Sequence, residues 1–291
     1  MLAMHAPDGF LEPGVAIVTA VLAVAIVGYC LRAARTEMGD AQVPLAGLAA
    51  AFVFAAQMFN FPVASGTTGH LLGGALAAVL LGPRVGTLVV TVVVVVQALL
   101  FADGGITALG YNVVNMAIVP AFGGWALFRL FRRVLPASSG GVVGATALAA
   151  GCSVVLSAAA FSLEWLFGAS APVPFDTVFA SMVGVHALIG IGEGVISGLA
   201  VAAVLAARPD LVTGAADLPA ESLAGRARVG ARTFAIGAVV ATLIVAVVVS
   251  QLSVDDPDGL EKVAEEEGFI SSAEDHALAD SPFADYATRG I

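Results

Sequence analysis

The segment VGTLVVTVVVVVQALLFA, which runs from Val85 to Ala102, contains no charged residue and is dominated by valine. A helix needs roughly 17–25 consecutive apolar residues to cross the hydrocarbon core of a bilayer, and this segment meets that length. The whole chain agrees, because 59% of its 291 residues are hydrophobic and only 12% are charged, which excludes an ordinary soluble domain. The sequence therefore predicts an integral membrane protein.

Similar apolar segments lie on both sides of this one. They are Val15–Leu31, Val43–Phe59, Leu71–Leu81, Val113–Phe131, Val142–Phe167, Val178–Ala207 and Phe234–Leu252. Leu71–Leu81 is too short to cross a bilayer alone, so we expect it to begin in, or pack beneath, the Gly/Thr-rich loop before it. We predict an all-α, multi-pass membrane bundle with seven core helices and one extra transmembrane helix. The expected divisions are residues 1–207, a basic connector 208–232, the added helix 233–252 and an acidic tail 253–291.

Basic residues predict the orientation of the bundle. Of the twelve, all but Lys262 and Arg289 fall on alternate connections, that is, on one side. These are Arg32, Arg35, Arg84, Arg129, Arg132, Arg133, Arg208, Arg226, Arg228 and Arg232. Cytoplasmic loops carry such an excess of arginine and lysine, so we expect the amino terminus, the loop at His70 and the acidic tail to lie outside a cell membrane.

A short polar stretch at the amino terminus, Met4-His5-Ala6-Pro7-Asp8-Gly9-Phe10, precedes the first apolar segment. It is either a solvated leader or a metal site. The predicted orientation places His5 on the same face as His70, which favours a metal site, although His70 alone would suit a helix cap or a core position. Imidazole nitrogen suits cobalt, nickel, copper and zinc. If Met4 were the first residue, its amine and the His5 amide could join the two imidazoles.

Two features of the segment Val178–Ala207 need an interpretation. Gly190, Gly194 and Gly198 are four apart and predict close helix packing, against this chain or another subunit. His186 and Glu193 share a helix face, and ionisable groups at membrane depth are costly. They are either a hydrogen-bonded pair that locks the bundle or a second ion site.

The chain lacks a phosphate-binding Gly-x-x-x-x-Gly-Lys-[Ser/Thr] loop, and its single lysine, Lys262, lies in the tail. We therefore expect no ATP hydrolysis by this chain, no other enzymatic activity and no cofactor. Nothing in the sequence points to nucleic acid as a partner.

Several motifs occur in an order that resembles a known family. They are Met4-His5-Ala6-Pro7-Asp8-Gly9-Phe10-Leu11, Phe59-Asn60-Phe61-Pro62, Gly69-His70-Leu71-Leu72-Gly73-Gly74, residues 101–110 (FADGGITALG), Asn115-Met116-Ala117 and residues 186–193 (HALIGIGE). From Met4 to Ala207 the chain resembles the CbiM/NikM family, the substrate-capture components of energy-coupling-factor importers for cobalt and nickel. The tail segment Asp256-Pro257-Asp258-Gly259-Leu260-Glu261 resembles the PDGLE domain, a CbiN-like region.

The resemblance implies that Met4, His5 and His70 hold transported Co²⁺ or Ni²⁺ on the external face. It also implies a transmembrane coupling subunit and a pair of cytoplasmic ATPase subunits as partners, with a small CbiN-like membrane subunit as a further one. The sequence departs from the family pattern where three residues precede Met4, which separates the chain's first amine from His5. An alternative function is a secondary transporter, driven by an ion gradient, for a divalent metal or an organic cation.

Overall fold

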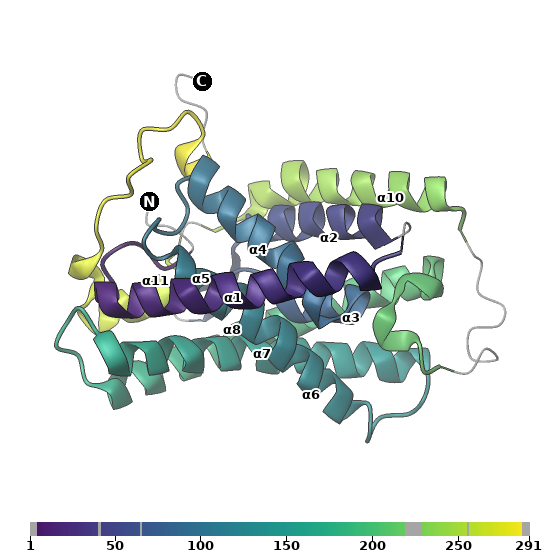
Figure 1. Ribbon diagram of the computed structural model, residues 1–291, viewed down its shortest axis with the longest axis horizontal. Coiled ribbons are helices and arrows are strands. Elements are labelled where there is room, and N and C mark those ends of the chain that lie inside the picture. The colour runs from purple at the N-terminus through teal and green to yellow at the C-terminus, as the bar shows by residue number, and fades with distance from the viewer. Residues whose placement is uncertain (1–4, 40–41, 65, 219–228, 255, 287–291) are drawn as a thin grey trace.

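The computed structural model describes residues 5–39, 42–64, 66–218, 229–254 and 256–286. Its long helices lie side by side along the longest axis of the molecule (Figure 1). The protein is a multi-pass helical membrane protein, as predicted. Met4 and part of the connector, residues 219–228, lie outside the described residues.

The described residues contain six helices that are long and apolar enough to cross a membrane. They are α1 (Pro13–Glu37), α4 (Pro83–Leu100), the continuous rod α5–η1–α6 (Leu109–Val113, Val114–Gly123, Gly124–Phe131), α7 (Ser139–Gly168), α8 (Phe175–Ala207) and the rod α10–η4–η5 (Ala231–Ile244, Val245–Val249, Ser250–Leu252). Two shorter helices, α2 (Gln42–Gln57) and α3 (Gly74–Leu81), occupy the other two predicted segments. Every predicted apolar segment is thus helical, but α2 and α3 are short for a span.

A small hairpin interrupts the helices between α2 and α3. Strands β1 (Phe61–Ala64) and β2 (Thr67–Gly69) pair antiparallel, with Phe61 opposite Gly69. Gly66 adopts a φ of +71° at the turn, a left-handed conformation that glycine tolerates without strain. The sequence predicted an irregular loop here. The hairpin matters because β2 leads directly into His70.

The glycines of α8 pack against α7. A Cβ atom on Gly190 would lie 2.5 Å from the carbonyl oxygen of Gly151, and one on Gly194 would lie 2.6 Å from that of Ala147. Backbone therefore meets backbone along this helix pair, which only glycine allows at these positions. The predicted packing role is confirmed, and the partner helix belongs to the same chain.

The tail folds back over one end of the bundle, the end at which α1 begins (yellow in Figure 1). It contains α11 (Gly259–Glu266) and the single turns η6 (Ile270–Ser272) and η7 (Ala284–Tyr286). Two other single turns, η2 (Pro209–Leu211) and η3 (Thr213–Ala215), follow α8 and are not part of the tail. Phe269 of the tail is fully buried, with its ring 5.3 Å from that of Phe10 and 4.5 Å from that of Trp165. The tail is a docked part of the fold and covers the amino-terminal segment.

Candidate metal site

The amino-terminal segment is held in the bundle by backbone contacts on both sides of Ala6. The Ala6 amide donates to the Asn112 side-chain oxygen at 3.2 Å, and the Asn112 side-chain amide donates back to the Ala6 carbonyl at 2.9 Å. The hydroxyl of Tyr111 donates to the Pro7 carbonyl at 2.9 Å. Asn112 and Tyr111 lie on α5, so this helix determines where His5 sits.

Asp8 anchors the same segment a second time. Its carboxylate accepts the backbone amides of Ile106 at 3.1 Å, Thr107 at 2.7 Å and Ala108 at 3.1 Å, and also the Thr107 hydroxyl at 2.6 Å. Three of these donors reach Oδ1 and one reaches Oδ2, and hydrogen bonds to a charged acceptor are strong. Asp8 therefore anchors the segment to residues 106–108.

His5 is 2% exposed, and neither ring nitrogen has a hydrogen-bond partner among the described residues. Its Nδ1 lies 3.6 Å from the Asp103 carboxylate, and its backbone amide donates to the same oxygen at 3.2 Å. Burial lowers the pKa of His5, and Asp103 opposes that shift. Buried polar atoms in proteins are nearly always paired, so a buried neutral imidazole with both nitrogens unpaired is prepared for a ligand.

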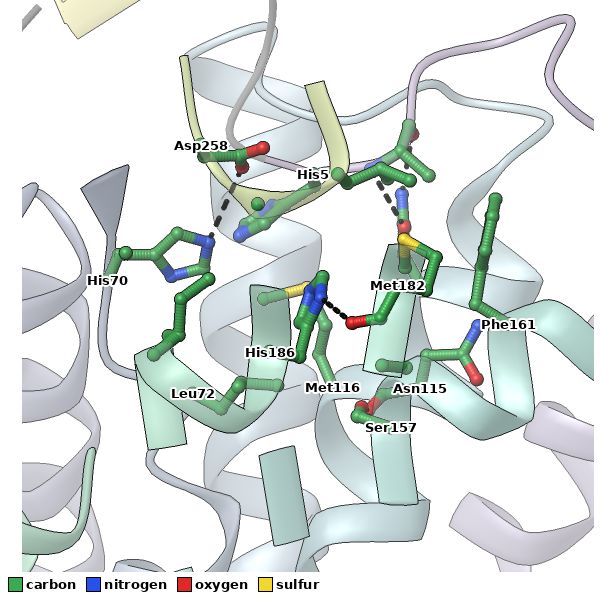
Figure 2. A pocket seen from close by; sticks show the side chains of 17 residues that line it. His5, His70, Leu72, Asn115, Met116, Ser157, Phe161, Met182, His186 and Asp258 are labelled. Atoms are coloured by element: carbon green, nitrogen blue, oxygen red, sulfur yellow. Dashed lines mark hydrogen bonds and ion pairs between the residues drawn. The ribbon is translucent and has the colours of Figure 1, made fainter. Parts of the chain in front are cut away.

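His70, which directly follows β2, faces His5. The two ring centroids are 5.7 Å apart with the planes at 65° (Figure 2). The Nδ1 atom of His70 lies 3.1 Å from the Leu71 carbonyl, which favours the tautomer with the proton on Nδ1 and a basic Nε2. His5 and His70 are two of the three predicted ligands. They are 65 residues apart in sequence, and the structure brings them together.

Asp258 completes the outer wall of the site, and the sequence did not identify it as a site residue. It lies at the start of α11 in the tail, is 5% exposed, and its Oδ2 atom is 3.8 Å from His70 Nε2 (Figure 2). Burial raises the pKa of Asp258 to about 6, and the neighbouring His70 opposes that rise. A second buried acid, Asp103, accepts the Tyr286 hydroxyl at 2.6 Å, so the tail supplies one of the two carboxylates beside the imidazoles and contacts the other.

A cavity of about 80 Å³ lies between these residues and the helices below. His5, His70 and Asp258 line its outer part, and Asn115, Met182 and His186 are among the side chains that line the rest (Figure 2). The described lining residues include no lysine or arginine. A cavity with imidazole and carboxylate groups and no fixed cation suits a positively charged ligand.

His186 and Glu193 do not pair with each other; the structure gives each a different partner. The Nδ1 atom of His186 lies 2.8 Å from the Met182 carbonyl of its own helix. The fully buried carboxylate of Glu193 accepts the backbone amides of Leu72 at 2.7 Å and Gly73 at 3.0 Å. Glu193 therefore holds the backbone that follows His70 against α8. This role is closer to the predicted structural role than to an ion site. Glu193 stabilises the bundle by holding a loop against α8 and not by pairing with His186.

Within the described residues, no three His, Cys, Asp or Glu side chains are close enough together to hold one metal ion. Met4, the third predicted ligand, lies outside those residues.

Known proteins and domains are similar to both parts of this chain. A family model described as "CbiM: Cobalt uptake substrate-specific transmembrane region" matches residues 5–211, and a PDGLE domain model matches residues 232–291. A putative metal transport protein of Haloquadratum walsbyi is 44% identical over 209 residues, covering 72% of this chain and 93% of that protein. A putative fused nickel transport protein, NikMN, of Archaeoglobus fulgidus is 40% identical over 212 residues, covering 72% and 68%.

A solved structure is also similar. The crystal structure of a truncated transition metal transporter superposes with a TM-score of 0.61 at 31% identity, covering 69% of this chain and 98% of that one. The relatives are metal transport proteins and not enzymes.

Proposed function

Since this chain belongs to the CbiM family of cobalt-uptake transmembrane proteins and carries a PDGLE domain after it, we propose that it is the membrane subunit that captures Co²⁺ or Ni²⁺ for an energy-coupling-factor importer. The observation that supports the proposal is the buried His5 ring, which lies 5.7 Å from the His70 ring and has no hydrogen-bond partner on either nitrogen among the described residues. Imidazole suits both ions, so the proposal covers both.

The ligands of the transported ion are His5, His70 and the amine of Met4, which processing or translation from Met4 would expose. The expected divisions stand as part of this proposal: metal capture by residues 1–207, a cytoplasmic connector at 208–232, an added transmembrane helix at 233–252 and an external tail at 253–291. The distribution of arginine supports an external amino terminus and tail.

Energy for transport comes from partners in this proposal. A transmembrane coupling subunit and two cytoplasmic ATPase subunits supply it, because this sequence contains no phosphate-binding loop. A small CbiN-like membrane subunit is a further partner. The imported ion is substrate, and no resident cofactor takes part.

The test is metal binding to the purified full chain, by titration calorimetry with NiCl₂ or CoCl₂ alone. His5→Ala and His70→Ala should each weaken binding by more than the roughly 10–100-fold that loss of a residue contacting a ligand costs. His276→Ala is the matched control, because His276 lies in the tail and its side chain accepts only the Leu278 amide, at 2.9 Å, among its described hydrogen bonds. Wild-type binding by folded His5→Ala and His70→Ala variants would refute the assignment.

Transport itself separates the two candidate mechanisms. We expect uptake of ⁵⁷Co²⁺ or ⁶³Ni²⁺ in cells that co-express the ATPase subunits, and its loss when their catalytic glutamates are replaced. Uptake that persists without the ATPases and stops when the ion gradient is collapsed would instead establish the secondary transporter.

A further inference from the structure

The tail reaches the metal site through contacts with the hairpin. The Thr68 amide donates to the Pro257 carbonyl at 2.9 Å, and the Thr68 hydroxyl donates to the Asp256 carbonyl at 2.9 Å. Thr68 lies in β2, two residues before His70. Strand β2 therefore positions both the tail and the His70 imidazole. These hydrogen bonds to the tail backbone hold Asp258 beside His70.

Gly259 brings the tail close to α8 at this point. A Cβ atom there would lie 2.5 Å from Ile189 Cδ1 and 3.0 Å from His186 Cε1. A larger residue at this position would have to displace the Ile189 side chain or the start of α11. The Asp-Gly pair at 258–259 therefore combines a carboxylate with a residue that permits close approach to α8.

The two carboxylate oxygens of Asp258 have different tasks. Oδ1 accepts the Glu261 amide at 2.8 Å and so caps the amino terminus of α11. Oδ2 is directed at His70 Nε2, 3.8 Å away, which is too long for a hydrogen bond. Oδ1 holds the helix start, the Leu260 amide also contacts the carboxylate, and Oδ2 lies on the side of the imidazole.

The separation of 3.8 Å is one that a single metal ion spans. With bonds of about 2.1 Å to an imidazole nitrogen and to a carboxylate oxygen, such an ion would subtend an angle of roughly 130°. A buried carboxylate without a cation is costly, and the described residues that line the cavity provide no lysine or arginine. A divalent ion would offset that cost.

We propose that Asp258 of the tail is a ligand of the transported metal ion, through Oδ2, together with His70 Nε2. This inference rests on the proposed function, because it assumes that the ion binds at His70. It makes the site a shared one, with nitrogen ligands from the membrane bundle and an oxygen ligand from the PDGLE region. A carboxylate ligand also raises the coordination number above that of an all-nitrogen planar site.

The experiment compares Asp258→Asn with Asp256→Asn in the purified full chain, with CoCl₂ or NiCl₂ as the only probe. Asparagine caps helices as well as aspartate does, so α11 keeps its start while the anionic oxygen is lost. Asp256 is exposed and contributes only its backbone carbonyl to the Thr68 contact, which makes its variant the matched control. We expect at least a tenfold weaker Kd for Asp258→Asn and an unchanged Kd for Asp256→Asn.

X-ray absorption of the metal-loaded wild type supplies a readout that does not depend on folding of a variant. We expect a coordination number above that of a planar all-nitrogen site in the wild type, and one ligand fewer in Asp258→Asn. For nickel, a paramagnetic ion in the wild type and a diamagnetic, planar ion in Asp258→Asn would agree with this.

Three results would overturn the inference. The first is a wild-type Kd for Asp258→Asn. The second is a weaker Kd with an identical absorption spectrum, which would make Asp258 a neighbouring charge only. The third is a wild-type coordination number no higher than that of a planar all-nitrogen site. If His70→Ala abolishes binding in the same series, the proposed function survives these results, whereas binding that also survives His70→Ala would refute both.

Discussion

Replacement of Asp8 tests whether anchoring of the amino-terminal segment limits metal affinity. Asp8→Ala removes four hydrogen bonds and leaves three backbone amides, those of residues 106–108, without this acceptor. Hydrogen bonds to a charged group contribute about 1.5–3 kcal/mol each, but they are not additive and water can replace some, so we estimate about 3–5 kcal/mol. Since each 1.4 kcal/mol is tenfold, the upper limit on the loss of metal affinity is roughly 10²- to 4 × 10³-fold. The loss reaches this limit if the amino-terminal segment is mostly undocked in the variant. The apparent metal affinity falls in proportion to the fraction of protein whose segment is docked and able to bind the ion.

Asp8→Asn keeps one acceptor oxygen and should lose only roughly tenfold, at about 1–2 kcal/mol. Glu12→Gln is the control, because the Glu12 side chain is exposed. Calorimetry with NiCl₂ measures affinity, and hydrogen exchange with mass spectrometry measures protection of residues 104–110. An Asp8→Ala variant that binds nickel within threefold of wild type and keeps the same exchange protection would refute the reasoning.

Three other substitutions test the supports of the site and of the bundle. Glu193→Ala should lower the thermal midpoint in detergent and weaken metal binding, because two buried backbone amides lose their acceptor at a cost of about 2–4 kcal/mol. Gly190→Leu should lower the yield of folded protein in size-exclusion chromatography by forcing apart two helices in backbone contact, whereas Gly184→Leu, which meets nothing within 4 Å, should not. Phe269→Ala should cost about 3–5 kcal/mol of tail docking and expose the tail to protease, and the half-exposed Phe283→Ala should have a smaller effect. Equal protease sensitivity of the two phenylalanine variants would contradict the last expectation.

The transmembrane segments were predictable because lipid imposes a length on apolar runs. Their ends were less so. The helix that contains Val142–Phe167 begins at Ser139, where the Ser138 hydroxyl accepts the Gly141 amide as a cap. Such caps lie in polar sequence outside the apolar run, so hydropathy alone places the boundary too far inside.

The two histidines were predictable as partners through orientation and motif resemblance, and the structure brings their rings together. Asp258 was not predictable as a residue of this site, because it lies 188 residues after His70 in a tail with many other acidic residues. The spacing Asp258-x-x-Glu261 does predict a helix start. Only the tertiary contacts of the tail show that this helix starts against an imidazole. The pairing of His186 with Glu193 was one of two interpretations, and backbone groups, which no side-chain pattern reveals, are the partners observed instead.

The attachment of the tail to the bundle through the α10 rod has a consequence for assembly. Docking of α11 is intramolecular, so its concentration at the site is set by the connecting chain and not by expression level, and short tethers of this kind give effective concentrations on the order of millimolar. A separate subunit with the same docking surface would have to be made in matching amounts to cover every site. The fused chain instead guarantees one tail per membrane bundle, and dilution of the protein in the membrane leaves that ratio unchanged.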